Sequence, residues 1–468
     1  MKKILFTIAL VAGIALTSCQ GFLDRDPSTS LSSEGSITSA ADVEKAINGL
    51  SYRFTTSRFS YPSEFGIYAD LLTDNFKVIK SNGQTTSISS YTITSTDYPS
   101  ENGFSIWYRA AAAANKALLE SKDIKDEGID NLQGQLYAWR ALCHFDLARM
   151  YCRIPSTVSN TSEANSGIII SDKVFEPDYK GTRATLADTY KQVIDDFTTA
   201  IGLLDAKNDL GYMNKYAAIA LRARAYLYMG EYQKALDDAI DVIEHSGKSL
   251  YEISEYASAW SQQGTKESLL ELLITDTYNP QRYALGYYMD QSGYAECGFN
   301  VDGELFQYLS THPEDVRSKL IKDQTTASGG TAGYYPAKYP GQSGSSTPLY
   351  TNNPKIIRLS EVYLIAAEAA FYCKNDGGAT SAKYINDLNA KRITGYKSVS
   401  KVSIDDIIFA YTVEMFCENQ IAFAHWRNKK TITNQVGQTV GADHQRAILP
   451  IPQSELDLNK NLVQNPGY

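Results

Sequence analysis

The sequence predicts a mostly α-helical fold built from helix pairs that pack side by side. Several segments carry apolar residues at helical spacing; the clearest is 186–204, with apolar positions at offsets 0, 4, 7, 8, 11, 15 and 18. At 216–244 a glycine separates two such segments, as in a helix pair. Two long stretches lack this periodicity, about 61–105 and 276–352, and predict irregular regions inserted into the helical scaffold.

Local signals place the helix ends. Thr185 with Asp188, and Ser403 with Asp406, have the spacing of N-terminal caps, in which side chains bond the free amides of the first turn. Gly230 should end the preceding helix. We therefore expect helices over 132–151, 186–204, 216–229, 232–244, 359–371 and 380–391, and another after Ser403.

Three helix pairs follow from these segments: 132–151 with 186–204, 216–229 with 232–244, and 359–371 with 380–391. The turn at 229–232 and the following Ala235 fit the tetratricopeptide pattern. Stacked pairs of this kind form a solenoid-like scaffold, because each pair buries its apolar face against the next. The expected fold is therefore a tetratricopeptide-like α-α superhelix with irregular insertions.

The N-terminus has the features of a bacterial lipoprotein signal. Lys2 and Lys3 precede an apolar run at 4–16 that is too short to span a bilayer, and small residues lead to Cys19. We expect 1–18 to be a cleaved signal peptide, Cys19 to be lipidated, and 19–36 to be a flexible tether before a single domain at 37–468. The alternative is an ordinary secretory peptide with an incidental cysteine.

Composition argues against several functions. The net charge of −9 disfavours nucleic acid and anionic membrane surfaces as partners. The five remaining cysteines form no C-x-x-C spacing and are expected to be buried free thiols, although Cys143 and Cys152 could pair. The five histidines lack metal-ligand spacing, and no hydrolase or phosphate-binding motif is present. We expect no enzyme activity, no cofactor and no metal site, although sequence leaves a paired-carboxylate glycosidase open.

Tyrosines are the candidate ligand-binding residues. Trp107, Trp139 and Trp426 have core periodicity, and Trp260 precedes an apolar strand-like run, so we assign all four tryptophans to the core. The stretch 276–352 holds ten of the 33 tyrosines, and tyrosine can stack on sugar rings. The candidates are Tyr283, Tyr287, Tyr288, Tyr335 and Tyr339 from this stretch, with Asp74, Asn75, Lys77 and Tyr98 from the earlier one. The alternative for each tyrosine is simple loop packing.

The C-terminal segment 444–468, with Pro-Ile-Pro at 450–452 and Gln-Asn-Pro-Gly-Tyr at its end, resembles the SusD/RagB family. Four further segments agree with that family in order along the chain: 19–27, 107–115, 183–200 and 358–369. Two segments depart from it. The helix region at 411–427 lacks the paired arginines and the glycine of the family pattern, and the loop at 151–155 also differs.

The resemblance implies a surface-exposed lipoprotein of the Bacteroidetes outer membrane, with palmitate among the lipids at Cys19. It also implies four tetratricopeptide-like helix pairs that support a loop-rich ligand face, and a role as the lid of a TonB-dependent SusC-type barrel in polysaccharide utilisation. The expected ligand is an oligosaccharide. A peptide-binding lid of a peptide importer is the alternative, and a cell-surface glycoside hydrolase is the third hypothesis.

Overall fold

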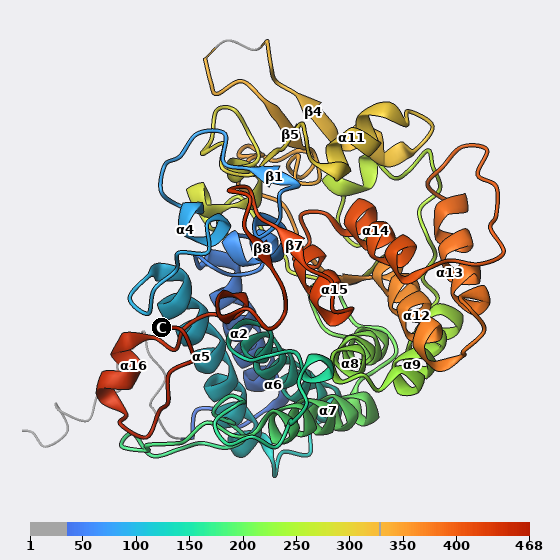
Figure 1. Cartoon of the computed structure of the whole chain (residues 1–468). Helices are drawn as coiled ribbons and strands as arrows, with labels where there is room; N and C mark the ends of the chain where they lie inside the picture. The colour runs from blue at the N-terminus through green and yellow to red at the C-terminus, as the bar shows by residue number, and fades with distance from the viewer. Residues whose placement is uncertain (1–34, 327–328) are drawn as a thin grey trace, which may run out of the picture.

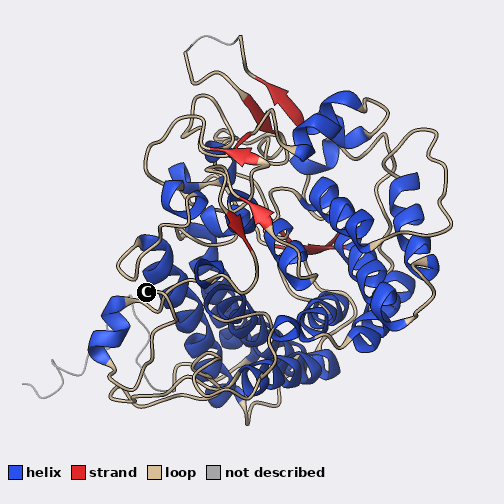
Figure 2. Cartoon of the chain, in the orientation of Figure 1, coloured by secondary structure: helices blue, strands red, loops and turns tan. Residues whose placement is uncertain are grey.

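The computed structural model describes residues 35–326 and 329–468. The signal peptide, Cys19 and all but the last two residues of the tether predicted at 19–36 lie outside the described residues. Helices dominate the architecture, and loops with a few short strands gather at one end of the molecule (Figures 1 and 2). Within the described part of the chain, no helix has the length and apolar character needed to cross a bilayer.

The elements follow one another in a mainly helical order. The helices are α2 (Ala40–Thr56), α3 (Tyr68–Leu71), α4 (Thr86–Ser89), α5 (Tyr98–Ser121), α6 (Ile129–Tyr151), α7 (Leu186–Leu203), α8 (Lys215–Met229), α9 (Tyr232–His245), α10 (Leu285–Tyr288), α11 (Glu304–Thr311), α12 (Leu359–Cys373), α13 (Ala379–Ala390), α14 (Ile404–Met415), α15 (Ile421–Arg427) and α16 (Gln453–Leu458). The strands are β1 (Phe76–Lys77), β2 (Ser268–Glu271), β3 (Gly298–Phe299), β4 (Ile321–Asp323), β5 (Tyr334–Pro336), β6 (Lys355–Arg358), β7 (Ile432–Thr433) and β8 (Thr439–Val440). They pair antiparallel as β1 with β3, β2 with β6, β4 with β5, and β7 with β8.

The helix ends agree with the sequence signals. The Thr185 hydroxyl accepts a hydrogen bond from the Asp188 amide at 3.0 Å, at the start of α7. Ser403 and Asp406 form a reciprocal capping box at the start of α14. Gly230 has a φ of +77°, the left-handed conformation that ends a helix most easily when the residue has no Cβ.

The three predicted helix pairs are confirmed. Helix α6 packs on α7, α8 packs on α9, and α12 packs on α13; further contacts of α7 with α8 and of α9 with α12 join the pairs into one stack (Figure 1). Ala218 and Ala225 on α8 and Ala239 on α9 are fully buried, and such small side chains let packed helices approach closely. The scaffold is therefore the expected tetratricopeptide-like arrangement of helix pairs.

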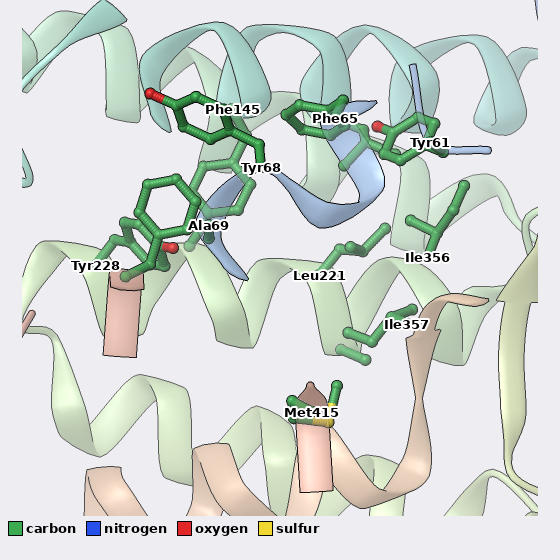
Figure 3. Close-up of a cluster of buried hydrophobic side chains, with 14 of the residues drawn as sticks. Tyr61, Phe65, Tyr68, Ala69, Phe145, Leu221, Tyr228, Ile356, Ile357 and Met415 are labelled. Atoms are coloured by element: carbon green, nitrogen blue, oxygen red, sulfur yellow. The ribbon is translucent and has the colours of Figure 1, made fainter. Parts of the chain in front are cut away.

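Side chains from distant segments meet in the core between the helical stack and the N-terminal short helices (Figure 3). Phe65 comes from the 3₁₀ helix η2 (Glu64–Ile67), Phe145 from α6 and Leu221 from α8, while Ile357 and Met415 come from β6 and α14. Each is at most 1% exposed. Burial of such apolar surface is the main favourable contribution to folding.

The tryptophan prediction is also confirmed, and the cysteine prediction is confirmed except for the burial of Cys373. Trp107, Trp139, Trp260 and Trp426 are all buried, with exposed fractions of 0%, 1%, 5% and 1%. The five cysteines beyond position 34 are free; four are buried and Cys373 is partly exposed. Cys143 and Cys152 therefore do not pair.

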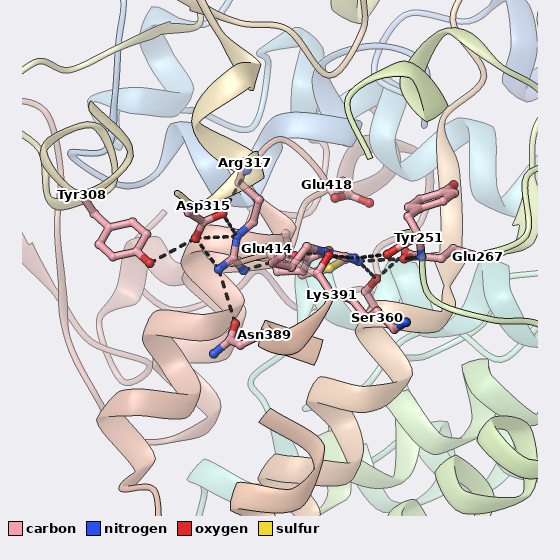
Figure 4. Close-up of polar contacts among 12 residues, drawn as sticks. Tyr251, Glu267, Tyr308, Asp315, Arg317, Ser360, Asn389, Lys391, Glu414 and Glu418 are labelled. Atoms are coloured by element: carbon pink, nitrogen blue, oxygen red, sulfur yellow. Dashed lines mark hydrogen bonds and ion pairs between the residues drawn. The ribbon is translucent and has the colours of Figure 1, made fainter. Parts of the chain in front are cut away.

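A cluster of buried charges joins the helical stack to the loop-rich end (Figure 4). We call it the Glu414 cluster, and it consists of Glu267, Asp315, Arg317, Lys338, Arg358, Arg392, Glu414 and Glu418. Its four carboxylates balance its four cations. Every member is buried, so each charge depends on its partners rather than on water.

Glu414 lies at the centre of this cluster. Its carboxylate accepts hydrogen bonds from Arg358 at 2.7 Å, from Arg392 at 3.1 Å and from Arg317 at 3.2 Å. Burial alone would raise the pKa of Glu414. The pKa is instead held below its usual range by the positive charges of Arg392, Arg358 and Arg317. The segment that departs from the family pattern at 411–427 thus supplies the central carboxylate of the cluster.

Replacing Glu414 by glutamine should destabilise the fold strongly. The neutral amide leaves three arginines short of a buried counter-charge, which typically lowers the free energy of unfolding by about 3–5 kcal/mol. Urea unfolding followed by circular dichroism measures the loss. The matched control is Asp195→Asn, which removes the exposed pair of Asp195 with Lys191 and should leave the unfolding midpoint unchanged. Equal midpoints for both variants would contradict the structural role of the cluster.

His144 predicts a dependence of stability on pH. Its ring is fully buried on α6, and burial together with nearby Arg140 lowers its pKa to about 3. In the unfolded chain the pKa is about 6.5, so between these values the unfolded state binds a proton that the folded state does not. Acid therefore destabilises the folded chain through His144, by about 2 kcal/mol between pH 7 and pH 5.

The variant His144→Gln tests this linkage. Glutamine does not titrate and retains an oxygen that can accept the 3.1 Å hydrogen bond from the Ser171 amide. Urea unfolding at pH 7 and pH 5 should show the variant losing about 2 kcal/mol less stability than the original chain over that interval. A difference between the two proteins that stays constant with pH would count against a neutral buried His144.

Candidate functional site

A cleft of about 610 Å³ lies between α2 and α5. Helix α2 and the two residues that follow it form one wall, α5 forms the other, and the 3₁₀ helix η5 (Gln281–Tyr283) adds Tyr283. The lining residues are Gly49, Tyr52, Arg53, Thr56, Ser57, Arg58, Tyr98, Asn102, Ser105, Ile106, Arg109 and Tyr283.

Helical periodicity places the polar side chains on the α5 wall. Tyr98, Asn102, Ser105 and Arg109 fall at offsets 0, 4, 7 and 11, which is one face of a helix. Trp107 lies on another face of α5 and is fully buried. The apolar face of α5 thus packs into the core while its polar and aromatic face lines the cleft.

Arg58 forms a stack with two tyrosines inside the cleft. Its guanidinium carbon lies 4.2 Å from the centre of the Tyr98 ring and 4.7 Å from the centre of the Tyr283 ring. A cation over an aromatic face is attracted by the ring quadrupole. This contact brings together two residues that are far apart in the sequence and fixes both rings at the cleft.

Glu64 holds Arg58 in this position. The Arg58 Nε donates to a carboxylate oxygen of Glu64 at 2.6 Å, and the Tyr288 hydroxyl donates to the same oxygen at 2.6 Å. The other oxygen accepts a hydrogen bond from the Phe59 amide at 3.1 Å. Burial and the negative charge of Glu64 raise the pKa of Tyr98 to about 12, so its phenol stays neutral at physiological pH.

The segment that carries Glu64 is attached to the loop between α14 and α15. Helix α3 follows η2 directly, and its Asp70 accepts hydrogen bonds from the Cys417 amide at 2.7 Å and the Asn419 amide at 2.9 Å. A second contact joins the same segments, because the Ala69 amide donates a hydrogen bond to the side-chain oxygen of Asn419 at 2.9 Å. Cys417 and Asn419 both have positive φ, so the loop turns sharply to present these groups.

A band of tyrosines continues from the cleft along the loop-rich end. Tyr294 contacts Tyr283, Tyr287 and Tyr288, with ring centres 6.4, 4.9 and 5.3 Å away. Tyr287 also contacts Tyr350 at 5.7 Å. Aromatic rings in such contact stabilise one another and hold the surface beside the cleft in one shape.

A second hollow of about 430 Å³ adjoins the cleft and shares Gly49 and Tyr52 with it. Tyr52 and Tyr278 meet edge to face there with ring centres 5.3 Å apart, and they are 48% and 52% exposed. Leu210 and Leu273 add exposed apolar surface. The cleft is therefore open on this side, toward a surface with two accessible aromatic rings.

The structure brings some of the predicted site residues to the cleft. Tyr98 and Tyr283 line it directly. Tyr287 is half-buried in the neighbouring tyrosine band, and Tyr288 is buried, with its hydroxyl on Glu64. Both support the cleft rather than face it.

The other predicted residues lie elsewhere. Tyr335 and Tyr339 are buried, and their hydroxyls donate to the carbonyl oxygens of Thr331 at 2.7 Å and Cys417 at 2.8 Å. Asp74, Asn75 and Lys77 lie at or next to β1, which pairs with β3 near α11. The Asn75 side chain accepts from the Leu305 amide at 3.1 Å, Asp74 is half-buried and Lys77 is exposed.

Sequence reasoning missed seven non-aromatic polar residues of the cleft. They are Arg53, Thr56, Ser57, Arg58, Asn102, Ser105 and Arg109. The helical spacing of Asn102, Ser105 and Arg109 with Tyr98 could have indicated the α5 wall. A polar face on a helix whose tryptophan is in the core marks a side of that helix that is exposed to solvent or ligand. No local signal marks Arg58, since its partner Tyr283 lies 225 residues further along the chain.

The chemistry of the cleft is that of binding. Among its described lining residues there is no aspartate, glutamate, cysteine or histidine, so the carboxyl or imidazole group that usually activates a hydroxyl nucleophile does not line it. Elsewhere in the described chain, no group of three His, Cys, Asp or Glu side chains could hold a metal ion. Aromatic rings flanked by arginine, amide and hydroxyl groups are instead suited to hold a polar ligand that has a flat apolar face.

Two family models match most of the chain. One, described as starch-binding associating with outer membrane, matches residues 21–227, and the SusD family model matches residues 307–468. The chain belongs to the SusD/RagB family. This family consists of binding proteins without catalytic activity, which agrees with the predicted lack of enzyme activity.

Individual known proteins are similar to this chain over nearly its whole length. A SusD-like protein P2 of Formosa agariphila is 24% identical, and the match covers all of both chains. A SusD superfamily structure from Bacteroides thetaiotaomicron is 29% identical with a TM-score of 0.82, covering 92% of this chain and all of the other. A SusD-like carbohydrate binding protein from Bacteroides vulgatus, 16% identical, shares the fold with a TM-score of 0.77 over 91% of this chain and 98% of the other.

Proposed function

We propose that this SusD-like protein captures oligosaccharides at the cell surface and passes them to a TonB-dependent SusC-type barrel in the outer membrane. The observation that supports this most directly is the stack of Arg58 with Tyr98 and Tyr283 in an open cleft. Family membership supports it too, because the matching models describe starch binding and association with the outer membrane. The carbohydrate-binding protein of the same fold is a third support.

The cleft offers what a sugar ring needs. A pyranose presents C–H groups on its faces, which pack against aromatic rings such as Tyr98 and Tyr283. Its hydroxyls lie around the ring and require donors and acceptors, which Asn102, Ser105 and Thr56 supply from the two helical walls. Because Arg58 and Glu64 fix the rings beforehand, little conformational entropy is lost when the sugar binds.

A peptide ligand fits this cleft less well. An extended peptide gains much of its affinity by adding backbone hydrogen bonds to the edge of a sheet. The walls here are the helices α2 and α5, whose backbone amides are bonded within the helices, and no strand lines the cleft. A glycoside hydrolase would need two opposed carboxyl groups, and the described lining residues include none.

Anchoring and delivery complete the proposal. A lipid on Cys19 and a tether at 19–36 would hold the domain at the outer surface of the membrane while leaving it free to move as a lid on the barrel. The lipoprotein signal supports the anchor, and the name of the first family model supports the membrane.

Tyr98→Ala and Tyr283→Ala should each weaken binding of the oligosaccharides that the original chain binds. Each change removes one ring from the cleft and one partner of Arg58. The free energy of binding should weaken by about 1 kcal/mol, which is a roughly fivefold increase in Kd. Isothermal titration calorimetry across a panel of purified glycans measures it. The matched control is Tyr179→Ala, because Tyr179 is 49% exposed and lies outside the cleft.

Two results would overturn the proposal. One is a chain that binds peptides from a tryptic pool and no glycan in the panel. The other is glycan binding that both cleft variants leave intact, since the ligand would then occupy another surface.

Cys19→Ala should release the protein from the membrane without changing its affinity for a glycan in solution. The substitution removes the thiol that would receive the lipid, which lies outside the domain that forms the cleft. Cell fractionation and protease treatment of intact cells report attachment, and calorimetry reports affinity. A weaker Kd in this variant would show that anchor and site are not separate.

A further inference from the structure

Basic side chains are concentrated in the cleft of a chain that is otherwise acidic. The whole sequence has 53 acidic and 44 basic residues, yet three of the twelve residues that line the cleft are arginines and none is acidic. These are Arg53 on α2, Arg58 just after it, and Arg109 on α5. A concave surface with one sign of charge attracts ligands of the opposite sign.

The three arginines are not equivalent. Arg58 is paired with buried Glu64 at 2.6 Å, so its charge is already balanced. Arg53 and Arg109 are exposed, and in the described part of the chain neither forms an ion pair. They lie on opposite walls of the cleft that also holds the stack formed by Arg58, Tyr98 and Tyr283.

Nearby carboxylates leave these two charges largely uncompensated. Burial raises the pKa of Glu455 on α16, although its neighbours Lys180 and Arg109 both act to lower it. Glu455 thus already has Lys180 as a neighbour of opposite charge. On α2, Asp42 lies about three helical turns before Arg53, accepts a hydrogen bond from Ser39 and pairs with Lys45 at 3.1 Å.

From this placement we propose that the cleft selects anionic oligosaccharides, with Arg53 and Arg109 binding carboxylate or sulfate groups on a chain whose sugar ring lies at Tyr98 and Tyr283. The inference rests on the proposed glycan-binding function and deepens it. A guanidinium presents paired N–H donors that match a carboxylate or a sulfate, and charged hydrogen bonds are stronger than neutral ones. A neutral glycan would leave both guanidinium groups without that partner, which is how such a site discriminates.

Matched pairs of glycans provide the test, with full-length protein purified in detergent. One pair is an oligogalacturonate and its methyl ester, which share a backbone and differ in charge. The second is a sulfated galactan oligosaccharide and its desulfated form, and neutral glucan oligosaccharides complete the panel. Calorimetry at low and high salt gives the Kd for each probe, because exposed ionic contacts weaken as salt rises.

The expected result is at least tenfold tighter binding of the anionic member in one of the two pairs, with an advantage that shrinks at high salt. The pair that shows this preference, uronate or sulfate, identifies the anion.

In the double variant Arg53→Gln with Arg109→Gln, the Kd of the neutral member divided by the Kd of the anionic member should fall to about one. Both residues are exposed, so the variant should fold, and its thermal midpoint checks this. The matched control is Lys397→Gln, an exposed charge outside the cleft, which should keep the full ratio.

Three outcomes separate this inference from the function on which it rests. If neutral glycans bind as tightly as charged ones, or if the double variant keeps the anionic preference, the inference is wrong and glycan capture stands. If neutral glycans bind and every anionic probe fails, the inference is also wrong. If no glycan of any charge binds, the proposed function fails and the inference fails with it.

Discussion

The buried Glu414 cluster is the constraint on which the rest of the structure depends. Its four carboxylates and four cations come from β6, α14, the loop between α14 and α15, the segment before β2, the segment after α13, and residues 315–338. Burying a charge is costly unless a partner and hydrogen bonds compensate it, so removing or displacing one member leaves another unpaired. Arg358 is an example: it donates hydrogen bonds to both Glu414 and Glu418, so its loss would leave both carboxylates without one of their cations. The cluster therefore fixes the loop-rich end against the helical stack, although the strands there are only two to four residues long.

The same constraint extends to the ligand cleft through short, directed contacts. Glu418 belongs to the cluster and lies between Cys417 and Asn419, whose amides both donate to Asp70. Asp70 is on α3, which continues directly from the 3₁₀ helix that holds Glu64. Glu64 in turn holds Arg58 between Tyr98 and Tyr283. The steps are buried hydrogen bonds to Asp70, the continuous backbone from α3 to η2, the ion pair of Glu64 with Arg58, and the cation–π contacts of Arg58. They position the aromatic rings before any ligand arrives, which reduces the entropy lost on binding.

The sequence predicted what depends on local periodicity and missed what depends on pairing between distant residues. Helix α7 and the cap at Thr185 could be predicted because apolar spacing and a capping side chain lie within one segment. Tyr98 and Tyr283 were named as binding candidates, but their stack on Arg58 needs a contact across 225 residues that no local pattern encodes. Tyr335 belongs to the same tyrosine-rich stretch as Tyr283, yet its ring is buried and its hydroxyl bonds a nearby carbonyl. Composition marks such a stretch as aromatic, and tertiary packing decides which rings reach the surface.

A crystal structure of the protein with a bound oligosaccharide tests the central claim most directly, namely that the arginine–tyrosine stack forms the sugar site. The account predicts a sugar ring in the cleft between α2 and α5, with a face against Tyr98 or Tyr283 and its hydroxyls bonded to Asn102 or Ser105. Arg58 should keep its contact with Glu64 in that complex. A sugar seated away from this cleft, for example beside β1 and α11, would contradict the account.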